Sequence, residues 1–355
     1  MELKNFNPVS EAVVQRTECQ RPRFPVIDFH THCGKLLLGK DYASLYNTKD
    51  YVRELLKYGV VKAVNLDGFY GKDLDEMNRK LEGFEDVFFN FMWVDIEHFD
   101  EPDFAKRVRK QIQECFDKGC CGIKMWKELT LCKKDASGKP IRTDDPRLDV
   151  VYETAADLGI PVLMHIADPV AFFKPKDGNN ERYEELDANP KWEFSDRSRY
   201  LSFEELMEMQ ENTIRSHRDT TFVIAHVGSY AENLDWVGNQ LLKYQNLYVD
   251  IAARLAELGR VPYSARRFFK KYQDRILFGT DATPITMGAH PIYYRCLETE
   301  DEYFSYEPEG EIPGQGRWAI YGLHLEDEVL KKLYYKNACR LLHLDEEVFE
   351  EEFYE

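Results

Sequence analysis

The chain has 355 residues, a length that allows one large domain or two ordinary ones. Apolar residues make up 43% of the sequence, which is enough for a sizeable core. The formal net charge of -17 argues against binding to nucleic acid or to an anionic membrane surface. Much of the acidic charge lies in residues 298–311 and 345–355, which we interpret as solvated surface and an acidic C-terminal tail.

Signals for export or membrane insertion are missing from the sequence. No apolar stretch approaches the roughly 18 residues of a spanning helix, and the N-terminus lacks the apolar region of a secretory signal. The eight cysteines are scattered, without the spacing of a zinc knuckle or of a disulfide framework. These features predict reduced thiols in a cytoplasmic protein.

Short apolar runs alternate along the chain with longer helical patterns. Continuous apolar runs are typical of strands that are covered on both faces. They predict strands at residues 24–30, 60–66, 87–94, 121–126, 160–166, 221–227, 247–252 and 276–281. Helical periodicity predicts amphipathic helices between them, at residues 50–58, 101–118, 147–158, 203–217 and 263–272.

Eight βα units in about 260 residues match a (β/α)8 TIM barrel, an α/β fold. We therefore predict a single barrel domain over residues 1–355, with its core at about 24–343. A doubly wound open sheet is the alternative, but no glycine-rich phosphate fingerprint follows the first strand. The connections at 167–202 and 282–324, after the fifth and eighth strands, are long enough to form substrate loops.

Potential metal ligands stand where four of these strands end. The sequence places His30 and His32 at the end of the first strand, and His165, His226 and Asp281 at the ends of the fifth, sixth and eighth. Residues i and i+2 of a strand point to the same side, so both imidazoles of the first strand can face the barrel axis. Each residue alone has a structural explanation, as a core histidine or as the start of a turn, but the coincidence favours a metal site. Imidazole nitrogen with carboxylate oxygen suits zinc, and also manganese or iron.

This arrangement resembles the amidohydrolase superfamily of metal-dependent barrels. Further motifs point to its amidohydrolase 2 branch, which includes the aminocarboxymuconate semialdehyde decarboxylase group. The resemblance covers about residues 24–343 and rests on the segments Asp28–His32, Gly122–Lys124, Ala225–Gly228, Phe278–Asp281 and Asn337–Leu342.

The resemblance implies that His30, His32, His165 and Asp281 bind one divalent ion, most simply zinc. His226 would then stand beside the ion as an acid/base or electrophilic group. In dinuclear relatives a carboxylated lysine on the fourth strand bridges two metals, so Lys124 and His226 join the ligands if the site is dinuclear. The alternative for Lys124 is an interior amine paired with a carboxylate, with Lys127 competing for a position at the rim.

The ligand set favours hydrolysis of a small-molecule ester, lactone or amide by a metal-activated water, with Asp281 and His226 as the catalytic groups. Non-oxidative decarboxylation of a small aromatic or unsaturated acid is the alternative. That reaction needs a cation for the substrate carboxylate, for which Arg254 is a better candidate than Arg197 or Arg199. We also expect Trp126 to contact the substrate.

A third hypothesis is a metal-binding or ligand-binding barrel without catalysis. As partners we expect a small-molecule substrate and, from related barrels, a second copy of the chain in a homodimer.

Overall fold

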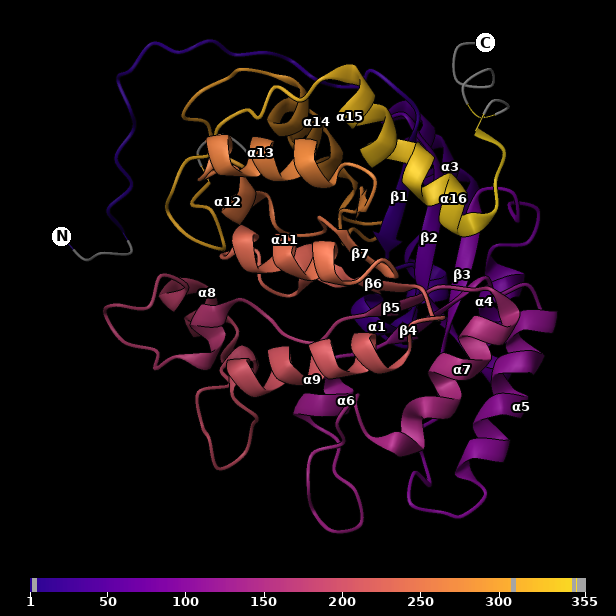
Figure 1. The fold of residues 1–355 in the computed structure, drawn as a ribbon. Helices are drawn as coiled ribbons and strands as arrows, with labels where there is room; N and C mark the ends of the chain where they lie inside the picture. The colour runs from indigo at the N-terminus through magenta and orange to yellow at the C-terminus, as the bar shows by residue number, and fades with distance from the viewer. Residues whose placement is uncertain (2–4, 308–310, 347–348, 350–355) are drawn as a thin grey trace.

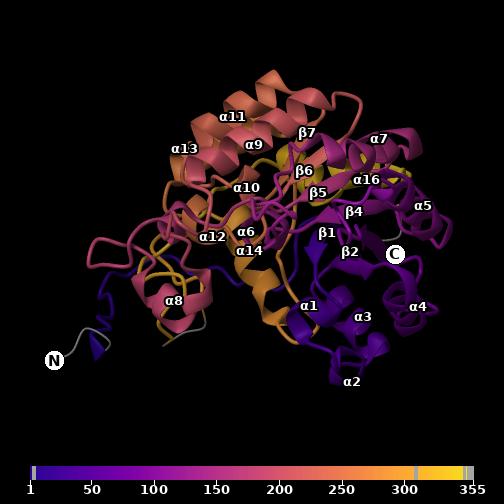
Figure 2. The same ribbon diagram turned by 90° about the horizontal axis from the view of Figure 1, so that it is seen from below.

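The centre of the protein is a parallel β-sheet that closes on itself (Figures 1 and 2). The computed structural model describes every residue except 2–4, 308–310, 347–348 and 350–355. Within the described residues the sheet has eight strands, each hydrogen-bonded to the next in chain order. They are β1 Val26–Thr31, β2 Val60–Phe69, β3 Phe88–Trp93, β4 Gly122–Met125, β5 Val162–Met164, β6 Phe222–Ile224, β7 Leu247–Asp250 and β8 Ile276–Leu277.

Backbone hydrogen bonds between β1 and the residues after β8 close the barrel. The amide of Phe29 donates to Phe278 O at 2.9 Å, and the amide of Asp281 donates to His30 O at 2.8 Å. Asp28 in β1 strengthens this seam, because its carboxylate accepts the amide of Thr280 at 3.1 Å and lies 3.1 Å from Nε2 of His290. The predicted (β/α)8 barrel is therefore confirmed.

Helices surround the barrel and cover the outer face of its strands (Figure 2). The predicted helices correspond to α3 Thr48–Lys57, α5 Phe104–Asp117, α7 Asp149–Leu158, α9 Phe203–Ser216 and α13 Pro262–Tyr272. Local signals set several of their ends. Ser202 and Glu205 form a capping box at the start of α9, and the side chain of Asn47 caps α3. The other α-helices in the barrel wall are α4 Gly71–Lys80, α11 Leu234–Lys243, α14 His290–Glu298, α15 Asp327–Lys331 and α16 Asn337–Leu342, the last two joined by the π-helical turn η6 Lys332–Lys336.

The long connections after the fifth and eighth strands are confirmed, and both contain structure. The connection after β5 carries η3 Val170–Phe173, α8 Tyr183–Ala188 and η4 Pro190–Trp192. The connection after β8 begins with η5 Met287–Ala289, continues as α14, and then pairs Phe304 with Ile320 in an antiparallel bridge. Shorter pieces elsewhere are α1 Lys35–Leu38, α2 Tyr42–Leu45, α6 Glu128–Leu131, η2 Pro146–Leu148, α10 Ala225–Gly228 and α12 Leu255–Leu258.

The structure corrects the ends of three predicted strands. β5, β6 and β8 stop before His165, His226 and Asp281, which the sequence pattern places inside the strands. The backbone turns at two of these points: His226 has φ 59° and Asp281 has φ 66°, in the left-handed region. Single backbone hydrogen bonds still join neighbouring segments here, such as the His165 amide to Met125 O and the His32 amide to Ala282 O, but the regular strands end and the three side chains lie at the rim.

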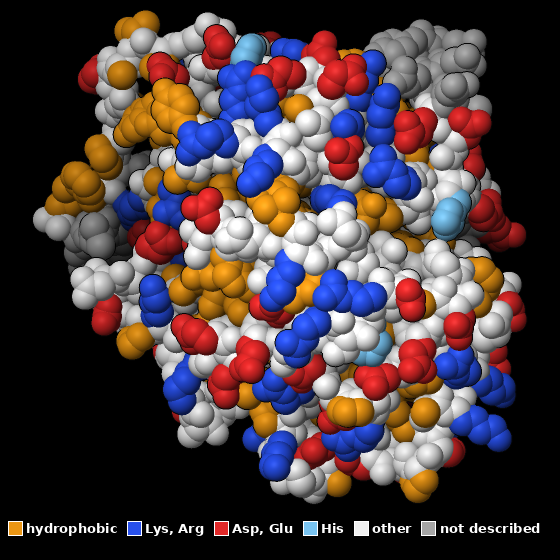
Figure 3. All heavy atoms as spheres, in the orientation of Figure 1, with side chains coloured by type: hydrophobic (Ala, Val, Ile, Leu, Met, Phe, Trp, Pro, Cys, Tyr) orange, Lys and Arg blue, Asp and Glu red, His pale blue; other side chains and the backbone are white. Residues whose placement is uncertain are grey.

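The surface carries charges of both signs. Acidic and basic side chains lie interspersed on the face drawn in Figure 3, so the negative net charge forms no single field there. Most of the predicted acidic tail falls outside the described residues. Among the helices that the structure describes, none combines the length and the apolar character needed to cross a bilayer.

Candidate metal centre

Each of the two histidines at the end of the first strand, His30 in β1 and His32 just after it, is held from behind by a carboxylate. Nδ1 of His30 lies 2.8 Å from Asp250 Oδ2, and Nδ1 of His32 lies 2.8 Å from Asp67 Oδ1. Because carboxylates accept hydrogen bonds, Nδ1 carries the proton in both rings and the Nε2 lone pair faces the barrel axis. Both Nε2 atoms are buried and lack a hydrogen-bond partner among the described residues.

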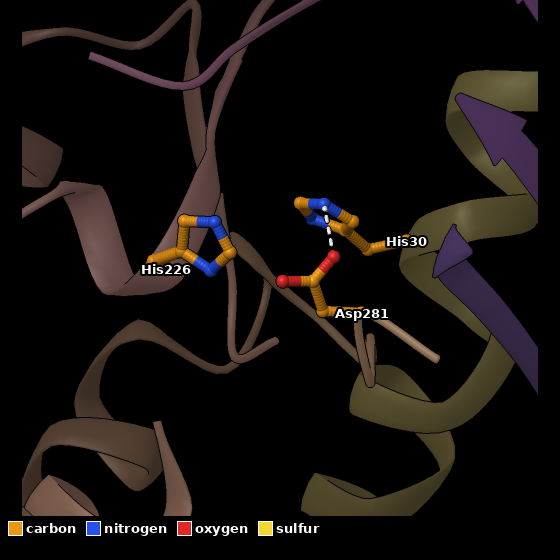
Figure 4. Close-up of side chains that lie close together, drawn as sticks. All are labelled: His30, His226 and Asp281. Atoms are coloured by element: carbon orange, nitrogen blue, oxygen red, sulfur yellow. Dashed lines mark ion pairs between the residues drawn. The ribbon is translucent and has the colours of Figure 1, made fainter. Parts of the chain in front are cut away.

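Asp281 faces these two orphaned nitrogens from the end of β8. Its Oδ1 lies 3.5 Å from Nε2 of His30 and 3.2 Å from Nε2 of His32. Two nitrogen lone pairs directed at a carboxylate oxygen repel it unless a cation or a proton lies between them. Figure 4 shows His30, His226 and Asp281 directed toward one common space, and their ligand atoms all lie within 4.8 Å of one another.

His165 and His226 complete the group from the ends of β5 and β6. Nδ1 of His226 donates to Ala252 O at 2.8 Å, and Nε2 of His165 donates to Asp168 Oδ1 at 3.2 Å. The remaining nitrogens, Nε2 of His226 and Nδ1 of His165, face each other at 3.3 Å. With these tautomers both are lone pairs, so this contact also fits a shared cation rather than a hydrogen bond. The ligand atoms of His30, His226 and Asp281 thus form the close group, with His32 beside Asp281 and His165 beside His226. Imidazole nitrogens with one carboxylate are a donor set that fits zinc, manganese or iron.

The backbone at His226 is strained to place its ring. Residues His226, Val227 and Ser229 have positive φ angles of 59°, 56° and 61°, so α10 is a left-handed turn. This conformation costs about 1–2 kcal/mol for each residue other than glycine. Asp250 offsets part of that cost, because its Oδ1 accepts the His226 amide at 2.9 Å. Strain held in place in this way is typical of functional sites.

Electrostatics keep most of the histidines neutral. Burial, reinforced by Lys124, holds the pKa of His30 well below its usual value, and burial with His165 does the same for His226. Burial lowers the pKa of His165 to about 3. Burial also opposes protonation of His32, but the carboxylates of Asp67 and Asp281 outweigh it and raise the pKa of that ring to about 9.

The carboxylate of Asp281 remains ionised. Burial favours its protonation, but His30 and His32 hold the pKa of Asp281 well below its usual value. The site thus presents an anionic oxygen beside three imidazoles that are held neutral, and His32 would have to release its proton to bind a divalent cation.

Lys124 lies in β4 beneath the ring of Trp126, with Nζ 4.9 Å from the ring centroid. It is buried, and in the described part of the chain Nζ makes neither a hydrogen bond nor an ion pair. Burial lowers its pKa to about 8. The expected pairing with a carboxylate is therefore not formed. Lys127 does not compete for this position, because its Nζ pairs with Asp168 Oδ2 at 2.6 Å.

A cavity of about 290 Å³ opens beside the ligand group, and His165, His226 and Asp281 line it. Arg254 also lines this cavity. It is 7% exposed, its Nη1 donates to Ala253 O at 2.8 Å, and it forms no ion pair with any described residue. The other two candidate arginines, Arg197 and Arg199, are not among the residues that line the cavity.

Aromatic rings form much of the cavity wall. Trp126 stands edge-on to His32 and His165, with ring centroids 5.6 and 5.7 Å apart, so it both packs the ligands and faces the cavity. Phe172 and Trp192, from the connection after β5, stack at 6.0 Å and line the same cavity. This wall suits a flat or apolar group beside the arginine.

Sequence reasoning missed the carboxylates that orient the histidines. Asp67 and Asp250 lie near the carboxyl ends of β2 and β7, and Asp168 follows β5 closely. The signal that selected the histidines, a polar residue at the end of an apolar run, applies to these aspartates as well. Extending it from ligands to their hydrogen-bond partners would have found them.

Comparisons with known proteins place this geometry in context. The sequence model of the amidohydrolase family, Amidohydro_2, matches residues 27–344. No curated protein matches the chain.

Solved structures share the fold at low sequence identity. A protein from Staphylococcus aureus described as an amidohydrolase is 15% identical, with a TM-score of 0.56 over 90% of this chain and 100% of its own. The 2,6-dihydroxybenzoate decarboxylase from Rhizobium is 13% identical, with a TM-score of 0.56 over 90% and 99% of the two chains. A dihydroxybenzoic acid decarboxylase from Polaromonas sp. JS666, solved with manganese and an inhibitor, is 12% identical, with a TM-score of 0.56 over 90% and 97%.

Proposed function

The chain belongs to the amidohydrolase family of metal-dependent barrel enzymes, and we propose that it hydrolyses an ester, lactone or amide bond in a small carboxylated molecule. The observation that carries this proposal is the position of Asp281 and Arg254 on one cavity. Asp281 belongs to the convergent donor group, and Arg254 is a buried cation without an anionic partner among the described residues. A substrate carboxylate would complete that pairing.

Four residues would hold the divalent ion, which we propose to be zinc, with manganese or iron as substitutes. They are His30, His32, His165 and Asp281, with His226 and Lys124 added if a second ion binds. A bound ion would supply Lewis acidity, polarising a substrate carbonyl and acidifying water.

The protein's own groups would bind the substrate and move the protons. Arg254 holds the carboxylate, and Trp126 packs against the body of the substrate. Asp281 accepts the proton of the attacking water through Oδ2, the oxygen not directed at the first-strand histidines. His226 presents a lone pair at Nε2, so it can donate to a leaving group only after it has accepted a proton there.

Isotope labelling tests the reaction directly. The metal-loaded enzyme is assayed in H2¹⁸O with a panel of carboxylated lactones, esters, amides and aromatic acids. Hydrolysis places ¹⁸O in the product, and His30→Ala and Asp281→Ala variants that fold by circular dichroism should lose turnover. Full turnover in these variants would contradict the proposal.

Non-oxidative decarboxylation is the second candidate, favoured by the free guanidinium of Arg254 and by the decarboxylases that share the fold. The same panel, repeated in D2O, separates the two reactions. Decarboxylation releases carbon dioxide. In D2O it leaves deuterium on a carbon of the organic product, and in H2¹⁸O that organic product gains no ¹⁸O.

A further inference from the structure

We propose that Lys127 is a positioning residue of the metal centre, which acts through Asp168 to present Nδ1 of His165 to the ion. This inference rests on the metal centre of the proposed function but not on the bond that the enzyme breaks. The chain of contacts begins at Lys127, next to α6, and ends at a histidine after β5.

The three side chains form one continuous hydrogen-bonded line. Nζ of Lys127 lies 2.6 Å from Asp168 Oδ2, and Asp168 Oδ1 lies 3.2 Å from Nε2 of His165. Both oxygens of Asp168 are therefore engaged, one by the ammonium and one by the imidazole. The opposite nitrogen of that imidazole, Nδ1, faces the ligand group at 3.3 Å from Nε2 of His226.

Asp168 selects the tautomer of His165. A carboxylate at Nε2 requires the proton there, which leaves the Nδ1 lone pair for the metal. The other three histidines have their partners at Nδ1 and present Nε2 instead. His165 is reversed, and its Nδ1 lone pair is available only because Asp168 accepts a hydrogen bond from Nε2.

Lys127 holds that carboxylate in place. The side chain of Asp168 is 6% exposed, and a carboxylate so deeply buried is costly without a cation. Lys127 is itself mostly covered and lies 5.9 Å from the ring of Trp192, so its ammonium is confined between the rim of β4 and the connection after β5. Without the ammonium, Asp168 would turn toward water, and this change would free the ring of His165.

The test measures metal binding, which requires no substrate. Affinity for zinc is determined by competition with a chromophoric chelator, and the visible spectrum of the cobalt-loaded protein reports the ligand geometry. Lys127→Met should lower zinc affinity about tenfold, the low end of the range for residues that support a ligand, and should alter the cobalt spectrum. Lys127→Arg keeps the ion pair and should restore most of the affinity.

The chain offers a matched control on its surface. Lys118 pairs with Asp75 at the same 2.6 Å separation, but both side chains are largely exposed. Lys118→Met should leave zinc affinity and the cobalt spectrum unchanged. Equal losses in the two methionine variants would overturn the proposal, because they would show a general effect of lost charge.

A double-mutant cycle shows whether Lys127 acts through His165. In a His165→Ala background, Lys127→Met should cause no further loss of zinc affinity. The same tenfold loss in both backgrounds, or wild-type affinity in Lys127→Met, would overturn the inference. If Lys127→Met does not fold by circular dichroism, Asp168→Asn is used in the same cycle with the same expectations. Absence of metal binding by the wild-type protein would instead overturn the proposed function.

Discussion

Oδ2 of Asp250 lies 2.8 Å from Nδ1 of His30, a contact between side chains 220 positions apart in the sequence. The other oxygen of the same carboxylate accepts the backbone amides of His226 at 2.9 Å and Ala252 at 3.1 Å. One buried group on β7 therefore orients a candidate ligand from β1 and fastens the strained turn after β6. This makes Asp250 the structural centre of the site although it does not face the cavity.

Replacing Asp250 should damage the metal centre and the fold together. In Asp250→Asn one carboxylate oxygen is replaced by an NH2 group, which cannot accept a hydrogen bond. Either His30 or the amide of His226 therefore loses its acceptor. We expect zinc affinity to fall roughly 10–100-fold. We also expect the free energy of unfolding to fall by about 1–3 kcal/mol, the cost of one buried unsatisfied polar group. Chelator competition and urea denaturation measure the two effects, and wild-type values for both would contradict this account.

Arg254 should affect substrate binding but not metal binding. Arg254→Met removes the cavity cation and keeps much of the side-chain volume. Because a charge-assisted hydrogen bond is worth about 1.5–3 kcal/mol, kcat/KM for a carboxylated substrate should fall roughly 10–150-fold. Zinc content should stay at the wild-type level. The same substrate with its carboxylate amidated is the control: a comparable loss on both compounds would mean that Arg254 does not bind the carboxylate.

Lys124 should destabilise the metal-free protein below its pKa. Burial depresses the pKa of this amine from 10.5 to about 8, so the folded state resists its protonation. Above pH 10.5 the amine is neutral in both the folded and the unfolded state, so it does not lower the free energy of unfolding. As the pH falls below 10.5 the unfolded state takes up the proton more readily, and the full destabilisation is reached below pH 8. At 1.36 kcal/mol per pKa unit the full penalty is about 3 kcal/mol.

Lys124→Met provides the measurement. With a chelator present, the variant should be more stable than the wild type at pH 7 in urea denaturation, and the difference should shrink toward pH 10.5. A difference that does not change with pH would contradict burial of a titrating amine.

Metal removal should lower stability by an amount that depends on the free metal concentration. A ligand at 100 times its Kd stabilises the folded state by about 2.7 kcal/mol. The Tm of the chelated protein should therefore rise when zinc is added, and His30→Ala should abolish the rise. A normal zinc-dependent Tm shift without turnover on the whole substrate panel would favour the non-catalytic barrel over both enzyme hypotheses.

Much of the fold could be read from local pattern. The apolar runs around Val26–Asp28 and Val162–Met164 are visible because strands buried on both faces need them. The ends of the strands were less predictable. His226 and Asp281 are not glycines, so their residue type does not predict a left-handed backbone. The turn is held by hydrogen bonds from their amides to Asp250 and His30 on other strands.

The sequence by itself determined the barrel, the family and the residue types that gather at its rim, because strand periodicity and the placement of His and Asp after apolar runs are local properties of the chain. Only the tertiary structure decided how those residues face one another. The tautomer of each ring depends on a partner, and Asp250, Asp67 and the carbonyl of Ala252 reach their histidines from other parts of the barrel. The same holds for Arg254: only the fold buries it at the cavity and leaves it without an ion pair to any described carboxylate.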